Sequence, residues 1–188
     1  RFAGRGGRLR LLVFGGSLGA RFLNHLLPKA ISLLPSDSRP EIIHQCGFKA
    51  VDEVKALYAE AGVEAAVQPF IEDMAAAYTW SDLVLCRAGA TSVSEICSAG
   101  AASLLVPLVV KTTSHQLQNA LFMEQNGASR CLRQDTLTPE RLSAVLASID
   151  RAQLLSMAEA ARKLSHSNAA SAVADMIESR ADRTFRVS

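Results

Sequence analysis

The 188-residue sequence is poor in aromatic residues, which make up 5% of it, and it contains no long apolar run. Proteins that bind single-stranded nucleic acids stack bases on aromatic side chains, so this composition disfavours that class. A helix that spans a bilayer needs roughly 20 consecutive apolar residues, and no run approaches that length. Residues 1–10 are basic, but no apolar segment ending in a cleavage site accompanies them, so we expect no secretory signal.

An excess of charge of one sign is also lacking, because the net charge is +2 at pH 7. A protein that binds nucleic acid by neutralising phosphates carries a larger positive charge. We therefore expect no nucleic-acid partner.

The cysteines and histidines form no metal-binding or disulfide pattern. The four cysteines are far apart and make no CxxC pair: Cys46, Cys86, Cys97 and Cys131. Three histidines are equally scattered: His25, His44 and His166. This spacing favours buried, reduced thiols of a cytoplasmic protein and structural histidines, and it predicts no metal site.

What the chain does contain is a regular alternation of apolar segments and helical patterns. The predicted strands are 9–14, 41–45, 64–68, 82–86, 103–107 and 130–133. The predicted helices are 18–34, 49–61, 73–79, 91–99, 115–126, 138–148, 151–164 and about 168–180. Such alternation produces βαβ units, so we predict an α/β fold with a doubly wound, Rossmann-like parallel sheet.

One domain is expected to occupy residues 1–188, because this length suits a single good core. The strands and helices of that core are expected within about 9–164, and a closing C-terminal helix within about 167–180. The first predicted strand begins near residue 9, so we expect no domain upstream of it in this chain.

A glycine-rich turn, Gly15 to Gly19, follows the first predicted strand and leads into a helix. The first N–H groups of a helix lack intrahelical partners and carry the positive end of its dipole. Glycine lets a phosphate approach the backbone closely. The turn therefore predicts an anion cradle, and the alternative is a glycine needed only for packing.

A second segment of this kind, residues 87–92, follows the fourth predicted strand. Two cradles at one edge of a parallel sheet suit a diphosphate. The alternative for Thr91 and Ser92 is simple N-capping of the helix. Glu95, one turn into that helix, could accept hydrogen bonds from a ribose diol or could merely complement the helix dipole.

Two further loops at the same predicted edge are candidates for ligand contacts. Residues 69–74 could offer backbone groups to a nucleobase beside Phe70 or Met74; alternatively, Asp73 caps a helix and Phe70 belongs to the core. Residues 111–119 carry amides that suit hexose hydroxyls, or they form a polar helix start.

A competing motif is G-x-S-x-G at residues 15–19, the nucleophile turn of α/β-hydrolases. Asp82 and His115 follow Ser17 in the matching order. That enzyme class needs earlier strands to build an oxyanion hole, and here the motif lies on the first strand, so we do not favour a hydrolase.

Taken in order, these segments resemble the C-terminal, donor-binding domain of the MurG family. This family comprises bacterial transferases that add N-acetylglucosamine (GlcNAc) from UDP-GlcNAc to the lipid-linked peptidoglycan precursor. The resemblance covers nearly the whole chain. It rests on residues 15–21, 23–24, 44–45, 58–62, 70–78, 80–90, 93–96, 116, 119–120 and 157–162.

The resemblance implies one half of a GT-B glycosyltransferase, a single UDP-sugar-binding domain. Gly16 and Ser17 would contact the diphosphate or nucleoside, the Ile71 backbone would read uracil, and Glu95 would hold the ribose hydroxyls. The phosphates would lie at the helix start formed by Gly89, Ala90, Thr91, Ser92, Val93 and Ser94. The hexose would face His115, Gln116 and Asn119. No catalytic residue, metal or cofactor is expected in this chain, which has no DxD motif.

The implied activity is inverting transfer of GlcNAc to lipid-linked MurNAc-pentapeptide in peptidoglycan synthesis, and hence in cell-wall biogenesis, cell shape and division. The N-terminal acceptor domain would be absent here, so the chain alone is expected to be inactive. The complete enzyme would lie on the cytoplasmic face of the inner membrane. Thr113 and Ser114 replace charged residues usual in the family, which leaves sugar selectivity open. The alternatives are a separately encoded donor subunit of a split UDP-GlcNAc transferase and a non-catalytic nucleotide-sugar-binding module.

Overall fold

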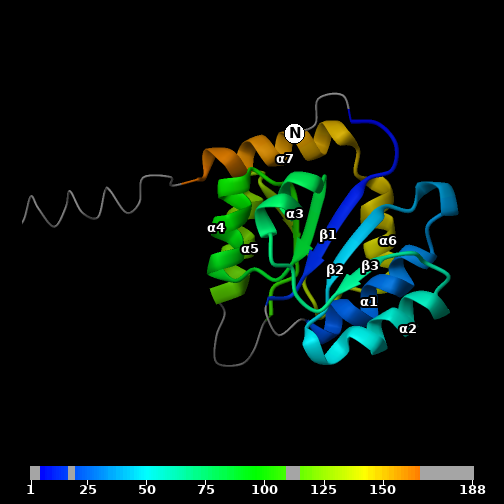
Figure 1. The fold of residues 1–188 in the computed structure, drawn as a ribbon. Coiled ribbons are helices and arrows are strands. Elements are labelled where there is room, and N and C mark those ends of the chain that lie inside the picture. Colours follow the sequence, from blue (N-terminus) through cyan, green and yellow to red (C-terminus); the bar gives the residue numbers. More distant parts are fainter. Residues whose placement is uncertain (1–4, 17–19, 109–114, 166–188) are drawn as a thin grey trace, which may run out of the picture.

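The computed structural model describes residues 5–16, 20–108 and 115–165 (Figure 1). These residues form a six-stranded sheet with the order β3-β2-β1-β4-β5-β6, and every neighbouring pair is parallel. The strands are β1 (Arg10–Phe14), β2 (Glu41–Gln45), β3 (Ala66–Gln68), β4 (Leu83–Cys86), β5 (Ser103–Leu105) and β6 (Ser129–Cys131). The predicted doubly wound α/β fold is confirmed.

Helices connect the strands at nearly the predicted positions. The α-helices are α1 (Arg21–Ser32), α2 (Val51–Glu60), α3 (Met74–Trp80), α4 (Ala90–Ala99), α5 (His115–Gln125), α6 (Pro139–Ser148) and α7 (Arg151–Lys163). Two short 3-10 helices are η1 (Ser36–Ser38) and η2 (Phe48–Ala50). The helix predicted at about 168–180 lies outside the described residues.

The sheet is covered on both faces, as its uninterrupted apolar strands predict (Figure 1). Successive side chains of a strand point to opposite faces. Leu11 and Val13 of β1 accordingly pack with α1, α2 and α6, whereas Leu12 and Phe14 pack with α3, α4 and α5. Two hydrophobic clusters, one on each face, therefore form the core.

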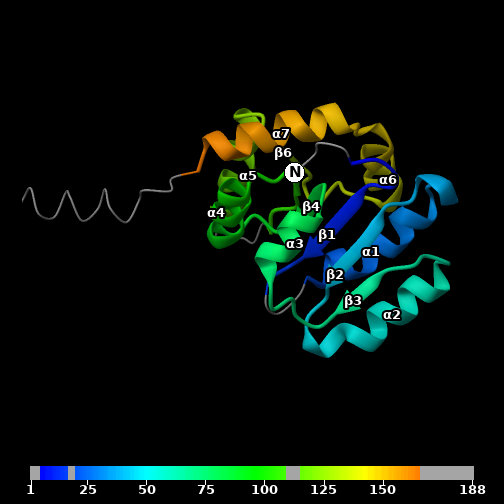
Figure 2. The same cartoon turned by 45° about the horizontal axis from the view of Figure 1, so that its top comes forward.

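Helix α7 crosses the amino edge of the sheet from one cluster to the other (Figures 1 and 2). Leu154 and Met157 near its start belong to the cluster of α1 and α6, and Ala161 near its end belongs to the cluster of α3 to α5. Helix α7 thus closes the amino edge and leaves the carboxyl edge for the loops that precede the helices.

Side-chain caps begin α3 and α6, and the cap at Asp73 confirms one of the two interpretations of that residue. Asp73 accepts a hydrogen bond from the Ala76 N–H at 2.8 Å at the start of α3. Thr138 accepts one from the Arg141 N–H at 3.3 Å, directly before Pro139 opens α6. Each cap satisfies a backbone donor that has no partner within the helix.

Asp82 is a buried anchor at the amino end of β4. Its carboxylate pairs with Arg5 at 2.9 Å and with Arg151 at 3.2 Å, and it accepts the Arg10 N–H at 3.1 Å. The loop that carries Ser17 begins at the opposite, carboxyl end of β1, although Ser17 itself lies outside the described residues. Asp82 therefore cannot join a Ser-Asp-His arrangement, and the hydrolase alternative is wrong.

The four cysteines are free, as predicted; three are buried and Cys131 is only partly buried. Burial raises the pKa of each thiol, so all four stay protonated near neutral pH. Within the described parts of the chain, none of the helices combines the length and apolar character needed to cross a bilayer.

Candidate functional site

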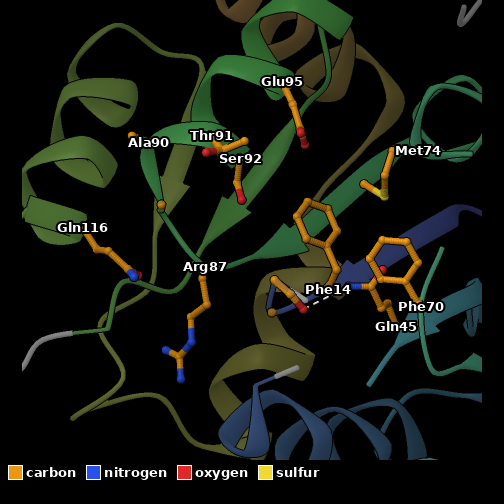
Figure 3. A pocket seen from close by; sticks show the side chains of 13 residues that line it. Phe14, Gln45, Phe70, Met74, Arg87, Ala90, Thr91, Ser92, Glu95 and Gln116 are labelled. Atoms are coloured by element: carbon orange, nitrogen blue, oxygen red, sulfur yellow. Dashed lines mark hydrogen bonds between the residues drawn. The ribbon is translucent and has the colours of Figure 1, made fainter. Parts of the chain in front are cut away.

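A pocket of about 440 Å³ opens at the carboxyl edge of the sheet, between the ends of β1 and β4 (Figure 3). Strand order reverses between these two strands, and the loops that follow them diverge to opposite faces. Doubly wound sheets bind ligands at this switch point. The pocket is lined by Phe14, Gly15, Gly16, Gln45, Phe70, Met74, Arg87, Gly89, Ala90, Thr91, Ser92, Glu95 and Gln116.

The amino end of α4 faces this pocket. The helix begins at Ala90 after Gly89, and no side chain caps it. Its first helical bond runs from the Val93 N–H to the Gly89 carbonyl at 3.0 Å, so three earlier N–H groups have no partner within the helix. Thr91 and Ser92 lie inside the first turn, so the N-capping interpretation of these residues is wrong. An anion at this point would meet these free N–H groups and also the positive end of the helix dipole.

Two glycines border the pocket for different reasons. Gly16 has φ +92°, a conformation that side-chain-bearing residues rarely adopt. Gly89 has an ordinary φ of −63°, and an added Cβ would find only Ser92 Oγ, at 4.0 Å. Glycine at 16 is therefore required by backbone conformation, whereas glycine at 89 leaves open space before α4.

Gln45 joins two of the loops that reach the pocket. It is the last residue of β2 and is 4% exposed. Its Nε2 donates to the Gly16 carbonyl at 3.0 Å, and its Oε1 accepts the Ile71 N–H at 2.8 Å. The backbone N–H of Ile71, which is predicted to contact uracil, is thus already bonded to Gln45 in this structure. Gln45 was not predicted as a site residue; a polar residue at the end of a buried strand is the signal that could have identified it.

Glu95 points from α4 into the pocket, between Ser92 and Met74 (Figure 3). Its Oε2 accepts a hydrogen bond at 3.1 Å from the hydroxyl of Tyr78 on α3. Burial, followed by the nearby Cys86 and Glu95, raises the pKa of Tyr78, so this hydroxyl remains a donor. Glu95 therefore has a specific partner in addition to its place on the helix.

Arg87 supplies positive charge at the end of β4 and was not singled out from the sequence. Its guanidinium donates to the Val106 carbonyl at 3.1 Å and lies 5.9 Å from the ring centroid of Phe22. Burial lowers the pKa of Arg87, but an arginine stays charged in proteins. Its position as the one charged residue of loop 87–92 could have identified it.

An aromatic wall closes another side of the pocket. Phe70 is 42% exposed and lines the pocket, so the interpretation of Phe70 as a core residue is wrong. Its ring stacks on the 72% exposed Phe48, with centroids 6.4 Å apart and planes 12° apart. Met74 lines the pocket beside them.

The residues predicted to face a hexose separate into three environments. Gln116 lines the pocket across from Phe70 and Met74, and its Oε1 accepts the Leu108 N–H at 2.9 Å (Figure 3). Asn119 donates to the Ala88 carbonyl at 3.0 Å and so supports the loop before α4. His115 is exposed at the start of α5 and is not among the lining residues.

The structure thus brings many of the predicted site residues to one pocket. Those that line it are Gly16, Gly89, Ala90, Thr91, Ser92, Glu95 and Gln116. Those that do not are Ile71, Val93, Ser94, His115 and Asn119. Ser17, Thr113 and Ser114 lie outside the described residues. Among the residues that the structure describes, no cluster of three or more His, Cys, Asp or Glu side chains could hold a metal ion.

Residues 10–178 match the family described as Glycosyltransferase family 28 C-terminal domain. The chain belongs to this family. Over 180 residues, this family 28 domain is 55% identical to the UDP-N-acetylglucosamine–N-acetylmuramyl-(pentapeptide) pyrophosphoryl-undecaprenol N-acetylglucosamine transferase of Methylibium petroleiphilum. That alignment covers 95% of this chain and 49% of the relative. The identically named protein of Azoarcus sp. is 50% identical over 182 residues, which cover 97% of this chain and 51% of the relative.

This family 28 domain therefore spans about half the length of the curated relatives it matches. The crystal structure of Acinetobacter baumannii MurG superposes with a TM-score of 0.88 at 41% identity, covering 95% of this chain and 54% of that one. CalG4, a calicheamicin glycosyltransferase, superposes with a TM-score of 0.68 at 18% identity, a likeness of fold alone. The resemblance to the MurG family and the GT-B fold class are both confirmed.

Proposed function

We propose that this chain binds UDP-GlcNAc as the donor half of an enzyme that transfers GlcNAc to lipid-linked MurNAc-pentapeptide in peptidoglycan synthesis. The observation that carries the proposal is the pocket at the sheet's switch point, where the amino end of α4 and the turn at Gly16 converge. The names of the relatives supply the identity of the sugar nucleotide.

In this proposal each end of the donor meets matching chemistry. The diphosphate lies at the α4 amino end with Arg87 nearby, and the Glu95 carboxylate accepts hydrogen bonds from the ribose diol. The uracil lies toward the loop of Ile71, with Phe70 as its apolar wall. The GlcNAc hydroxyls lie toward Gln116, whose NH₂ group can donate while its oxygen holds Leu108.

In the transfer step, this chain stabilises the negative charge that develops on the departing diphosphate. An acceptor hydroxyl attacks the anomeric carbon from the face opposite UDP, and the bond between that carbon and the phosphate oxygen breaks. The electron pair of this bond goes to the departing diphosphate, so negative charge develops beside α4. Backbone N–H groups that are already oriented toward this point stabilise the charge without reorganisation. The proposal includes no resident metal, because the helix end and Arg87 supply the neutralising groups.

The proposal assigns acceptor binding and the general base to the remainder of the complete enzyme. That enzyme would meet its lipid-linked acceptor at the cytoplasmic face of the inner membrane. This chain's part is to bind the donor, orient its anomeric carbon and stabilise the leaving group.

Calorimetric titration of the 188-residue chain with UDP-GlcNAc, UDP and ADP tests this proposal. UDP-GlcNAc and UDP are expected to bind, and ADP much more weakly. Glu95→Ala is expected to weaken UDP binding about 10- to 100-fold, since a carboxylate that accepts ribose hydrogen bonds is lost. Glu72→Ala is the matched control, because this exposed carboxylate is not among the lining residues. Equal binding of ADP and UDP, or no binding of either, would contradict the proposal.

A further inference from the structure

Glu95 lies between two hollows, the nucleotide pocket and a second one, so its carboxylate could turn toward either. The second hollow, also of about 440 Å³, lies between α3 and α4. Glu95 and Met74 line both hollows, whereas Tyr78 lines only the second of the two. With the Tyr78 hydroxyl bonded to it, the Glu95 carboxylate nevertheless points into the nucleotide pocket (Figure 3). A glutamate has several rotatable bonds, so a carboxylate placed between two spaces needs a fixed partner to favour one of them.

Tyr78 is that partner, and its ring is held rigidly. It is 4% exposed and lies in the core cluster of α3, α4 and α5. Its ring packs edge-on against Phe14, with centroids 6.1 Å apart and planes at 88°. A buried ring packed in this way has few alternative rotamers, so its hydroxyl is a fixed point.

The hydrogen bond between Tyr78 and Glu95 leaves the carboxylate able to bind a ligand. A carboxylate offers about four lone-pair sites on two oxygens. The Tyr78 hydroxyl uses one site, on Oε2, at 3.1 Å. Both hydroxyls of a ribose diol can still donate to the remaining sites, and the raised pKa of Tyr78 keeps its proton in place.

We infer that Tyr78 is a positioning residue for nucleotide binding, whose buried hydroxyl holds the Glu95 carboxylate toward the ribose hydroxyls. This inference rests on the proposed function, because it requires that Glu95 receive the ribose. Tyr78 itself touches no part of the nucleotide; it acts by reducing the freedom that Glu95 would otherwise lose on binding.

The test compares UDP with 2′,3′-dideoxy-UDP on wild type and on Tyr78→Phe, which keeps the ring and removes the hydroxyl. Wild type is expected to bind UDP more tightly than the dideoxy analogue. Tyr78→Phe is expected to weaken UDP binding about 3- to 10-fold and to leave binding of the dideoxy analogue unchanged. In a Glu95→Ala background, Tyr78→Phe should cause no further loss.

Tyr58→Phe is the matched control, because Tyr58 is 3% exposed and its hydroxyl bonds to His44, and neither residue lines the pocket. It should change the two affinities equally or not at all. An equal loss of both ligands in Tyr78→Phe, or an unchanged UDP affinity, overturns the inference and leaves the proposed function intact. If wild type itself binds both ligands equally, the ribose role of Glu95 fails, and the inference fails with it.

Discussion

His44 lies in a buried polar network that joins β2 to α1 and α2. Its Nε2 is 3.1 Å from Asn24 Oδ1, and its Nδ1 is 2.9 Å from the Tyr58 hydroxyl. Asn24 donates its amide to the Cys46 carbonyl at 3.0 Å, so Oδ1 is left to accept. This pattern places a proton on Nε2, whereas the Tyr58 hydroxyl can either donate to Nδ1 or accept from it. Burial lowers the pKa of His44, so the imidazole is neutral near pH 7 and the hydroxyl donates to Nδ1.

Acid is expected to destabilise the fold through this residue. Burial lowers the pKa of His44 from 6.5 to about 4. As the pH falls below 6.5, the unfolded chain takes up a proton at His44 and the folded chain does not, so stability is lost between 6.5 and about 4. The full loss amounts to roughly 3 kcal/mol. Urea unfolding at about pH 7 and about pH 5 should show roughly 2 kcal/mol of this loss, because pH 5 lies within that interval.

His44→Gln is expected to lower stability at neutral pH but to flatten its dependence on pH. His25→Gln is the control, because His25 is partly exposed beside Glu53 and lies outside the network. A His44→Gln variant with the same acid sensitivity as wild type would show that other groups cause the effect.

At the scale of elements, the position of β2 explains how Gln45 reaches two loops. Strand β2 lies between β1 and β3, so the loops after its two neighbours start on either side of its last residue. A carboxamide has a donor and an acceptor at one end and can bond to both loops at once. Gln45 does so with Gly16 and Ile71, and it thereby couples the glycine turn to the loop beside Phe70.

Gln45→Met is therefore expected to weaken UDP binding about 10-fold, because each loop loses a hydrogen bond, the one to Ile71 being buried, while side-chain volume is nearly kept. Stability should fall by about 1–2 kcal/mol, since the Ile71 N–H would lose its acceptor. Calorimetry and urea unfolding measure the two effects. Gln68→Met is the matched control, since Gln68 pairs with Gln45 in the sheet and is not among the lining residues. The same loss of affinity in both variants would refute the coupling of the loops.

For the whole molecule, Asp82 holds together three segments that are distant in sequence. Arg5 precedes β1, Asp82 directly precedes β4, and Arg151 is the first residue of α7. Arg151 also donates to the carbonyl of Gly7 at 3.2 Å. The side chain of Asp82 is 1% exposed, so its charge depends on these partners in place of water.

Asp82→Asn is expected to destabilise the protein by about 3 kcal/mol, because two arginines lose the buried carboxylate that neutralises them. UDP affinity should remain unchanged, since Asp82 lies at the amino edge of the sheet and the pocket at the carboxyl edge. The exposed pair of Arg133 and Asp135 supplies a control, for Asp135→Asn should cost under about 0.5 kcal/mol. Urea unfolding measures the loss of stability, and calorimetry measures the UDP affinity. Weakened UDP binding in Asp82→Asn would contradict the prediction and mean that the two edges of the sheet are coupled.

The order and type of the elements could be predicted from local patterns. Uninterrupted apolar runs such as Leu83–Cys86 are typical of strands buried on both faces, and Thr138 followed by Pro139 favours a helix start through capping chemistry. The glycine turn after β1 and the small residues after β4 also pointed to two loops that border the pocket, because those signals lie within a few consecutive residues.

Only the tertiary structure decided which side chains act together. Gln45 became a bridge because β2 lies between β1 and β3, and Tyr78 became the partner of Glu95 because α3 and α4 pack on the same face of the sheet. Asp82 became an anchor, and not a catalytic group, because it lies at the amino edge. Periodicity along a chain reports which face of an element is apolar, but strand order and sheet edge determine which distant polar groups meet.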